Sequence, residues 1–442
     1  METDTPLFGM DVPTSVVSPT QRDRSGRARL RRPDRDQMIL DPSSLEERLP
    51  VDHAARVIWA VIERVDWSAW EKRIDARGSV PGRAATDPRL LSGLLLLAAT
   101  EGIGSGRAIA ELCGRDIAYQ WMCGGVSVNH HTISDFRVGF EKELDALLSN
   151  LLAVLTHQGL VTVKRISQDG VRIRASAGRS SFRRGQTLAR LREEAQQHLE
   201  ELKRQSDDAG LPARIKAARA RGARDRLERI EQALALLPEA QAAKQRHTGK
   251  KSRHQPARVS TTDPQAHRLK TGTGAILPAY NIQLATDTHS RAIVGVSIGT
   301  SGSDGQYATP MRKQVQERTG QPVEEHLIDG GYFNKESLEL AQEQNVSIYM
   351  PLPKPQEGKT DPSLPKRGDG PGTLAWRARM IQEAAKQVYK QRASTSETVN
   401  ADLTTHRGMG RLLVRGVSKV KCVVLWSVLA YNIMHFAPSL LS

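Results

Sequence analysis

The hydrophobic period of this 442-residue chain changes near residue 160, and no other feature constrains the fold as strongly. Before this point, apolar residues recur every three to four positions, as they do in amphipathic helices. After it, they tend to alternate with polar residues, as they do in half-buried strands. The change predicts an all-helical N-terminal domain, followed by a domain with a mixed α/β sheet.

We assign the helical domain to residues 45–160. A second helix within it is expected to start at Asp87-Pro88, because Asp caps helix N-termini and Pro fits the first helical turn. Further helices are expected over 105–113 and 132–155. The first helix is predicted from the spacing of Ala54, Val57, Ile58, Val61, Ile62 and Val65.

Residues 1–44 differ from the rest of the chain. They are polar, contain Pro and carry six arginines between Arg22 and Arg32. A segment with so few apolar residues cannot bury enough surface to offset the entropy of ordering. We expect a disordered basic tail.

The strand-rich part spans residues 161–442. Strands are expected on both sides of Asp169, from the apolar residues Val161, Val163, Ile166, Val171 and Ile173. The segments 282–286 and 293–298 predict a hairpin. The elements expected after it are a strand (326–328), a helix (335–343), a strand (346–350), a Pro- and Gly-rich loop (356–372) and two helices (374–403 and 418–436).

A helical insertion is predicted at residues 183–258, between the first strands and the hairpin. Its two apolar stripes, from Leu188 to Leu202 and from Leu227 to Leu237, are narrow and suit two helices packed on each other. The segment contains 19 Lys and Arg against 10 Asp and Glu. Two interpretations stay open: a solvated helical hairpin, or a surface that contacts the DNA backbone.

The charge of the whole chain favours a polyanionic partner. Its net charge is +15 and its pI is near 9.9, which indicates nucleic acid first and an anionic membrane second. The longest apolar runs, 94–99 and 423–436, are too short or too interrupted to span a bilayer, and we find no signal peptide. Three cysteines without zinc-type spacing indicate reduced thiols in a cytoplasmic protein.

Three acidic residues stand apart by their context. Asp169 lies within predicted strand, Asp329 follows a short apolar strand, and Glu397 lies in a predicted helix. Carboxylates so placed suit two-metal phosphoryl transfer, in which Mg²⁺ ions stabilise both the attacking and the leaving oxygen of a phosphodiester. A structural role stays open for each: a hairpin turn at Asp169-Gly170, a strand-to-helix loop at Asp329, and a solvated helical Glu397.

The chain resembles the DDE transposases of bacterial insertion sequences, in the branch grouped with insertion sequence five. The resemblance rests on an ordered series of phrases that covers most of the chain. Its C-terminal phrases are STTDPQAH (260–267), PAYNIQLATDTHSRAIVGVSIGTSGSD (278–304), LIDGGYF (327–333), YMPLPKP (349–355), YKQRASTSE (389–397) and RGMGRLLVRGVSKVKCVVLWSVLAYNIMHF (407–436). Two N-terminal phrases, TDPRLLSGLLLLAATEG (86–102) and VNHHTISDFR (128–137), resemble the helical domain of these enzymes.

This resemblance implies an RNase H-like fold in which Asp169, Asp329 and Glu397 are the catalytic, metal-binding residues. It implies Mg²⁺ as the cofactor, with Mn²⁺ as a substitute. The reaction would be cleavage at the ends of the element, followed by transfer of the freed 3′-hydroxyl to target DNA. The implied partners are double-stranded DNA, as terminal inverted repeats and target, and further copies of the chain, in a cytoplasmic, nucleoid-associated protein. The helical domain would bind element ends or dimerise.

The chain departs from the family pattern around Glu397. Many relatives carry Tyr, Arg, Glu and Lys at fixed helical spacing; here Arg392 stands five residues before Glu397, and Thr404 occupies the place of the Lys. Some relatives also carry a cysteine cluster that this chain lacks, so we expect no zinc. The residues expected to contact phosphates are Lys390, Arg392, Arg407, Arg411 and Arg415.

Two alternatives stay open for the function. One is a nuclease of the same fold that cleaves DNA without joining it, and the other is an inactive DNA-binding relic of a transposase. Asp304 lies within the family-like text, but Ser303-Asp304-Gly305 is equally typical of a turn.

Overall fold

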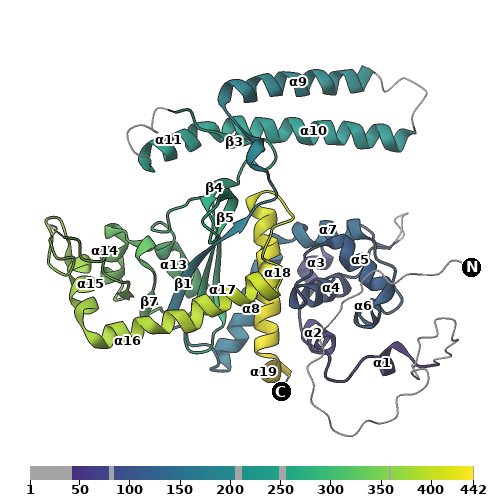
Figure 1. The fold of residues 1–442 in the computed structure, drawn as a ribbon. Coiled ribbons are helices and arrows are strands. Elements are labelled where there is room, and N and C mark those ends of the chain that lie inside the picture. Colours follow the sequence, from purple (N-terminus) through teal and green to yellow (C-terminus); the bar gives the residue numbers. More distant parts are fainter. Residues whose placement is uncertain (1–41, 79–83, 205–211, 248–254, 358–359, 442) are drawn as a thin grey trace, which may run out of the picture. The chain divides into compact units, whose positions relative to one another are not determined.

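The region before the sheet is helical, as predicted. The structure, a computed structural model, describes residues 42–78, 84–204, 212–247, 255–357 and 360–441 (Figure 1), so the predicted tail lies outside the described residues except for 42–44. The helices of this region are α1 (Leu45–Arg48), α2 (Ala54–Ile62), α3 (Ser68–Glu71), α4 (Pro88–Thr100), α5 (Gly106–Arg115), α6 (Ile117–Cys123), α7 (His130–Gly139) and α8 (Glu141–His157).

Helix α4 begins where the sequence predicts. The side chain of Asp87 accepts a hydrogen bond from the backbone N–H of Arg89, and Pro88 occupies the first helical position. The single helix predicted over 132–155 is wrong. Phe140, with φ −127° and ψ 47°, leaves the helical conformation and separates α7 from α8.

A mixed sheet forms the centre of the second half. Its strands are β1 (Arg165–Arg174), β4 (His267–Lys270), β5 (Ile276–Asp287), β6 (Ile293–Gly299), β7 (Glu325–Leu327) and β8 (Ser347–Tyr349). The strands β6, β5 and β1 pair antiparallel, whereas β1, β7 and β8 pair parallel. Strand β4 pairs with the first residues of β5. The predicted hairpin is confirmed as β5 and β6, and the fold is of the mixed α/β class.

Strand β1 passes through Asp169 without a turn. Asp169 pairs with Leu284 of β5, and Gly170 pairs with Gln283. The turn considered for Asp169-Gly170 is therefore wrong. The glycine has another reason to be there, since a Cβ at Gly170 would lie 2.4 Å from Nε2 of Gln283 and 2.7 Å from Oδ1 of Asn281.

The C-terminal half adds helices around the sheet. They are α13 (Ala308–Thr319), α14 (Lys335–Glu343), α15 (Pro371–Ile381), α16 (Glu383–Arg392), the π-helical turn η4 (Ala393–Glu397), α17 (Thr398–His406), α18 (Val417–His435) and α19 (Ala437–Leu441). The single helix predicted over 374–403 is wrong, because Gln382 is extended (φ −70°, ψ 136°) and ends α15. The helix predicted over 335–343 is confirmed as α14.

Helix α18 joins the two halves of the chain. It packs against α2, α4, α7 and α8 on one side and against β6 on another, so a single hydrophobic core extends from Leu49 to Phe436 (Figure 1). By length and composition α18 could cross a membrane, but 67% of its apolar window is buried within the protein. Every residue from 424 to 433 is buried, which explains the apolar composition as that of a core helix.

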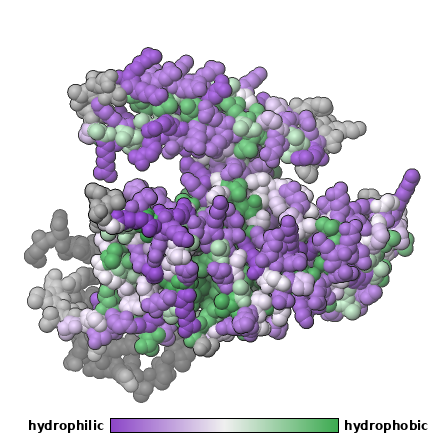
Figure 2. Space-filling view, turned by 180° about the vertical axis from the view of Figure 1, so that it is seen from behind, coloured by the Kyte–Doolittle hydropathy of each residue, from purple (hydrophilic) through white to green (hydrophobic). Residues whose placement is uncertain are grey.

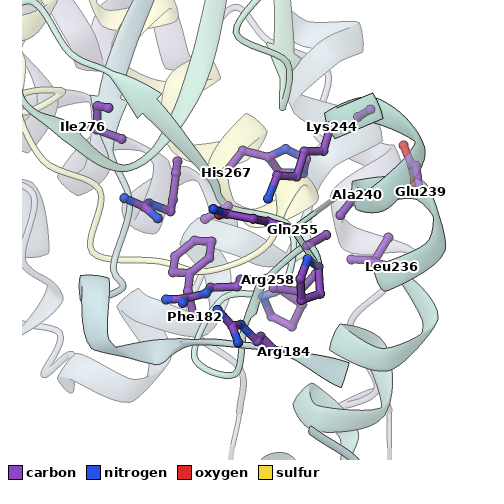
Figure 3. A pocket seen from close by; sticks show the side chains of 17 residues that line it. Phe182, Arg184, Leu236, Glu239, Ala240, Lys244, Gln255, Arg258, His267 and Ile276 are labelled. Carbon is purple, nitrogen blue, oxygen red and sulfur yellow. The ribbon is translucent and has the colours of Figure 1, made fainter. Parts of the chain in front are cut away.

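The insertion forms an arm, which we define as residues 182–260. Its helices α9 (Gly185–Arg204) and α10 (Ala213–Ala235) lie side by side, as predicted, and α11 (Leu237–His247) follows (Figure 1). The short strands β2 (Phe182–Arg183) and β3 (Val259–Ser260) pair at its base. Hydrophilic residues cover most of the arm on the face shown in Figure 2. A cavity of about 640 Å³ opens beside β2 and α11 (Figure 3).

We predict that Asn432 secures α18 to the sheet. Its amide donates to the carbonyl of Ile293 at 2.9 Å and accepts from the N–H of Ile293 at 3.0 Å, in a fully buried position. Asn432→Ala should lower the free energy of unfolding by about 2–4 kcal/mol, because two buried backbone groups lose their partner. Urea denaturation measures this loss. The exposed Lys419→Ala on the same helix should change it by less than about 0.5 kcal/mol, and equal effects would refute the role.

Candidate active site

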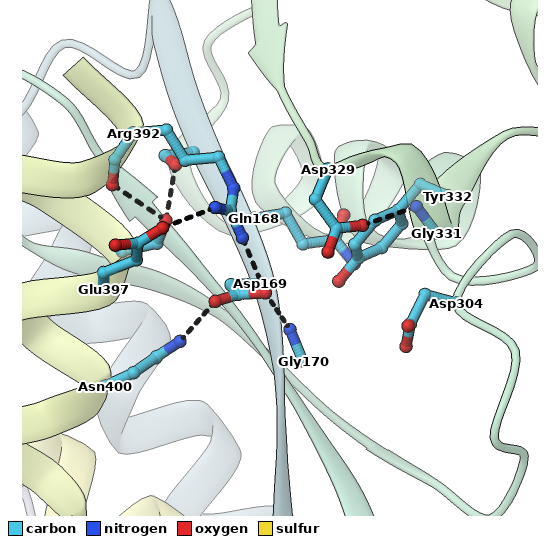
Figure 4. A network of polar contacts seen from close by, with 12 residues as sticks. Gln168, Asp169, Gly170, Asp304, Asp329, Gly331, Tyr332, Arg392, Glu397 and Asn400 are labelled. Carbon is cyan, nitrogen blue, oxygen red and sulfur yellow. Dashed lines mark hydrogen bonds and ion pairs between the residues drawn. The ribbon is translucent and has the colours of Figure 1, made fainter. Parts of the chain in front are cut away.

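Four carboxylates from four separate segments line one open cavity. The cavity has a volume of about 910 Å³, and its acidic residues are Asp169, Asp304, Asp329 and Glu397. Figure 4 shows Asp169 on β1, Asp329 and Asp304 on one side of it, and Glu397 on the other. Residues that lie 228 positions apart in the chain thus meet in one place.

The register of the parallel strands places Asp169 and Asp329 together. Ser167 of β1 pairs with Leu327 of β7, and each aspartate lies two residues after its paired residue. The carboxyl ends of neighbouring parallel strands open at the same edge of a sheet, where side chains can converge on a ligand. Asp329 itself begins a short 3₁₀ turn, and its Oδ1 accepts a hydrogen bond from the N–H of Gly331 at 2.8 Å.

Glu397 is positioned by the π-helical turn η4. The neighbouring Ser396 hydrogen-bonds through Oγ to Oγ of Ser167 at 2.7 Å, which fixes the turn to β1 in the interior. The turn also explains the five-residue spacing from Arg392 to Glu397. Residues five apart diverge on an α-helix, which has 3.6 residues per turn, but a π turn joins residue i to residue i+5. Nη1 of Arg392 therefore reaches Oε1 of Glu397 at 2.7 Å.

Arg392 bridges two of the carboxylates. Besides Glu397, it pairs through Nη2 with Oδ1 of Asp169 at 2.8 Å, and its side chain is only 11% exposed. Burial raises the pKa of Asp169 above its ordinary value, and the Arg392 guanidinium opposes this increase. Oδ2 of Asp169 also accepts a hydrogen bond from Asn400 at 3.3 Å.

Asp304 is held by buried amides beneath the cavity. Its Oδ1 accepts hydrogen bonds from Nδ2 of Asn281 at 2.6 Å and from Nε2 of Gln283 at 2.8 Å. Burial raises its pKa, and the hydrogen bond from Asn281 opposes this increase. A Cβ at Gly331 would lie 3.4 Å from Oδ2 of Asp304 and 2.9 Å from Oδ1 of Asp329, so these two oxygens flank the same point.

Sequence reasoning assigned no role in the site to Asp304. The sequence signal was its position in the family-like text, but the surrounding Ser and Gly favoured a turn. The buried amides that hold it come from β5, about twenty residues earlier in the chain. Only the sheet brings these residues together.

The residues expected to contact phosphates are not placed alike. Lys390, Arg411 and Arg415 are exposed, and Nε of Arg415 donates to the carbonyl of Ser176 at 3.2 Å. Arg407 is instead bound internally. Its Nε pairs with Oδ2 of Asp402 at 2.7 Å, and its guanidinium lies over the ring of Tyr431. Arg392 is the one member of the expected set whose described contacts join carboxylates of the cavity.

The carboxylate oxygens that line the cavity are the type of ligand that a hard divalent cation binds. Carboxylate oxygens are the ligands that Mg²⁺ prefers, and Oδ1 of Asn400 is buried at the same cavity without a hydrogen-bond partner among the described residues. Within these residues, however, no three acidic, His or Cys side chains are close enough to hold a metal ion. The guanidinium of Arg392 occupies oxygens of two of the carboxylates that would be needed.

Two family models match the chain. Residues 43–139 match a transposase domain (DUF772), and residues 244–433 match a transposase DDE domain. Two segments of the chain are therefore similar to transposase domains. Asp304, Asp329, Arg392 and Glu397 lie within the second matched segment, whereas Asp169 lies between the two. No curated protein and no solved structure matches the chain.

We predict that Asp304→Asn stabilises the protein at neutral pH. The folded-state pKa of Asp304 is raised above 3.8, so ionisation disfavours the folded state as the pH rises above this value. The gain from the substitution should therefore be present at pH 7 and should vanish as the pH falls to about 4. Denaturation midpoints measured at both pH values test this.

Asp361→Asn is the control of opposite sign. The pKa of this exposed carboxyl is lowered by hydrogen bonds from Ser363, so its removal should cost stability at pH 7 and cost less as the pH falls. If Asp304→Asn is destabilising at pH 7, burial does not disfavour the ionised form of Asp304 in the folded protein.

Proposed function

We propose that this chain, two segments of which match transposase domains, is a DDE transposase that cleaves and joins DNA at the ends of an insertion sequence. The observation that carries the proposal is the convergence of Asp169, Asp329 and Glu397 on one cavity within such a chain. These three residues are the proposed catalytic carboxylates. The proposed partners are double-stranded DNA and further copies of the chain, in the cytoplasm and at the nucleoid.

The strand order supports an RNase H-like arrangement. Asp169 lies on the first strand of the main sheet, and Asp329 follows the strand that pairs parallel with it. Glu397 lies in a helical segment late in the chain. The resemblance to DDE transposases implies the first Asp on the first strand, the second Asp just after the fourth strand and the Glu on a helix late in the domain. Strand β7 is the fourth strand of the main sheet in chain order when the short β4 is left out. The bounds of β1, β7 and the turn η4 come from the structure and not from the resemblance.

The proposed cofactor is Mg²⁺, with Mn²⁺ as a substitute. Asp169, Asp329 and Glu397 would hold it, and when bound it would supply Lewis-acid stabilisation of the phosphodiester oxygens. The chain's own residues contribute positioning. The buried Ser167–Ser396 hydrogen bond keeps the Glu397 turn against β1, and the N–H of Gly331 orients Asp329. Such preorganisation is how a site without a side-chain nucleophile gains rate.

Basic residues near the cavity would position the DNA backbone. Lys390, Arg411 and Arg415 are exposed and are proposed phosphate contacts, which orient DNA without reading its sequence. Arg392 could join them only after it leaves Asp169 and Glu397. Arg407 is omitted from the proposal, because Asp402 and Tyr431 engage its guanidinium.

We predict that Asp169→Asn, Asp329→Asn and Glu397→Gln each reduce cleavage of an element-end duplex at least about 100-fold, because each removes a charge at the reacting phosphate. DNA affinity should change little, since it depends mainly on phosphate contacts elsewhere. Cleavage of labelled duplex and anisotropy measure the two properties. Glu383→Gln, an exposed position on α16, is the matched control. A variant of the three that retains full cleavage would remove that residue from the site.

Strand transfer decides between the transposase and a nuclease of the same fold. Labelled element ends, cut in advance to expose the 3′-hydroxyl, are incubated with supercoiled target. Joined products support the transposase. Cleavage of uncut ends without any joining would establish the nuclease instead, and the absence of both activities would indicate the inactive relic.

We further predict that Arg392 competes with a divalent cation for Asp169 and Glu397. Arg392→Gln should bind Mn²⁺ at least about tenfold more tightly, because each charge-assisted hydrogen bond that it removes contributes about 1.5–3 kcal/mol to holding the carboxylates. Free Mn²⁺ measured by electron paramagnetic resonance gives the affinity without any reaction. Lys386→Gln removes an exposed charge from the same helix and should leave the affinity unchanged. If both variants bind Mn²⁺ equally, the competition does not exist.

A further inference from the structure

Another cavity on the arm is lined almost entirely by hydrogen-bond donors. It has a volume of about 520 Å³ and lies between α9, α10 and the segment after β3. We call it the arginine pocket. Its lining residues are Arg183, Arg190, Arg226 and Arg229, with Thr187, Thr261 and Thr262 and the aliphatic Leu191 and Ile230. No acidic residue lines it.

The packing of the two long helices builds this pocket. Thr187 and Arg190 are three residues apart on α9, and Arg226 and Arg229 are three apart on α10, so each pair shares one face of its helix. The helices are held together at this end by a small buried cluster around Leu188. Strand β2, which pairs with β3 at the base of the arm, adds Arg183. The arginines therefore converge through tertiary structure.

The charges in the pocket are largely unneutralised. Within the described part of the chain, Arg183, Arg226 and Arg229 form no ion pair, and Nε of Arg229 is buried without a hydrogen-bond partner. Arg190 pairs with Glu194, but both side chains are well exposed and such a pair is weak. Guanidinium groups gathered in this way repel each other unless an anion lies between them. Their planar donors suit phosphate oxygens in particular.

A second basic cavity lies on the other side of the same strand. Successive residues of a strand point to opposite faces, so Arg183 of β2 lines the arginine pocket while Phe182 lines the cavity of Figure 3. Arg184, the residue after β2, lines the cavity of Figure 3 as well. That cavity also contains Arg258 and Arg268, with Glu239 as its acidic residue. The base of the arm is thus basic on both faces, which a solvated helical hairpin would not require.

We propose that the arginine pocket binds phosphodiester groups of a DNA duplex, at a second contact surface separate from the catalytic cavity. The choice of DNA as the polyanion rests on the proposed function. The contact is independent of base sequence, because arginine and threonine donors reach phosphate oxygens and not base edges. The 23 residues of α10 extend over about 35 Å, which is close to one turn of duplex. The arm therefore offers a surface long enough to follow the backbone.

The test compares two triple variants that remove equal charge from the arm. The pocket variant is Arg183→Gln, Arg226→Gln, Arg229→Gln. The control variant is Arg192→Gln, Arg221→Gln, Arg224→Gln, at exposed positions of the same helices that do not line the pocket. Binding of a labelled duplex is measured by anisotropy in EDTA between about 50 and 200 mM salt. An element-end duplex and a scrambled duplex of equal length are used, and thermal unfolding verifies that both variants are folded.

For the pocket variant, the magnitude of the slope of log K against log salt should decrease by about 2 to 3, since each lost phosphate contact removes about 0.9. Affinity at about 100 mM salt should fall at least tenfold, to the same extent for both duplexes. The control variant should lose less than one unit of slope. Equal losses in both variants would overturn the pocket as a site. A pocket variant with the wild-type slope would also overturn it. This holds even if that variant dissociates an oligomer, because the arm would then serve oligomerisation and not DNA binding.

Failure of this proposal is distinguishable from failure of the proposed function. Asp329→Asn should bind DNA with the wild-type slope in EDTA, because it leaves the arm intact. A wild-type protein that shows the pocket-dependent slope but never cleaves or joins DNA would overturn the transposase and leave the pocket standing. A protein that cleaves and joins DNA, with a slope that the pocket variant does not change, would overturn the pocket alone.

Discussion

Burial of the central residues 424–433 of α18 is the constraint on which the remaining structure depends. A helix with apolar residues around its whole circumference must be covered on every face. Here the N-terminal helices cover one side and β6 covers another, with Asn432 hydrogen-bonded to both polar groups of Ile293. The two halves of the chain therefore share one core. The sheet that holds the carboxylates is stabilised by the helices that precede it.

Within this frame, the cavity depends on opposing electrostatic effects. Burial raises the pKa of Asp169 and Asp304, which means that the fold holds these carboxylates where ionisation is unfavourable. Arg392 offsets part of this cost by pairing with Asp169 and Glu397. The same guanidinium occupies oxygens that a cation would need. Carboxylates gathered in one cavity repel each other unless they are held apart or their charge is neutralised, and Arg392 neutralises Asp169 and Glu397.

The sequence was informative where the signal is local. The start of α4 follows from the capping chemistry of Asp87 and Pro88, and α14 and the β5–β6 hairpin follow from hydrophobic period and turn residues. Local patterns failed at breaks inside helical segments. Nothing in the apolar spacing distinguishes Phe140 or Gln382 from helical residues, yet both leave the helical conformation.

The sequence by itself determined the mixed α/β class, the helical N-terminal region, the basic arm and the order of the three acids. Each of these depends on neighbouring residues or on composition. Tertiary structure decided which acids share a cavity, because the register of β1 with β7 and the π turn before Glu397 align residues far apart in the chain. It also brought Asp304 to the cavity and gathered the arginines of the arm. Side-chain convergence depends on packing between elements, and the spacing of residues along the chain does not encode it directly.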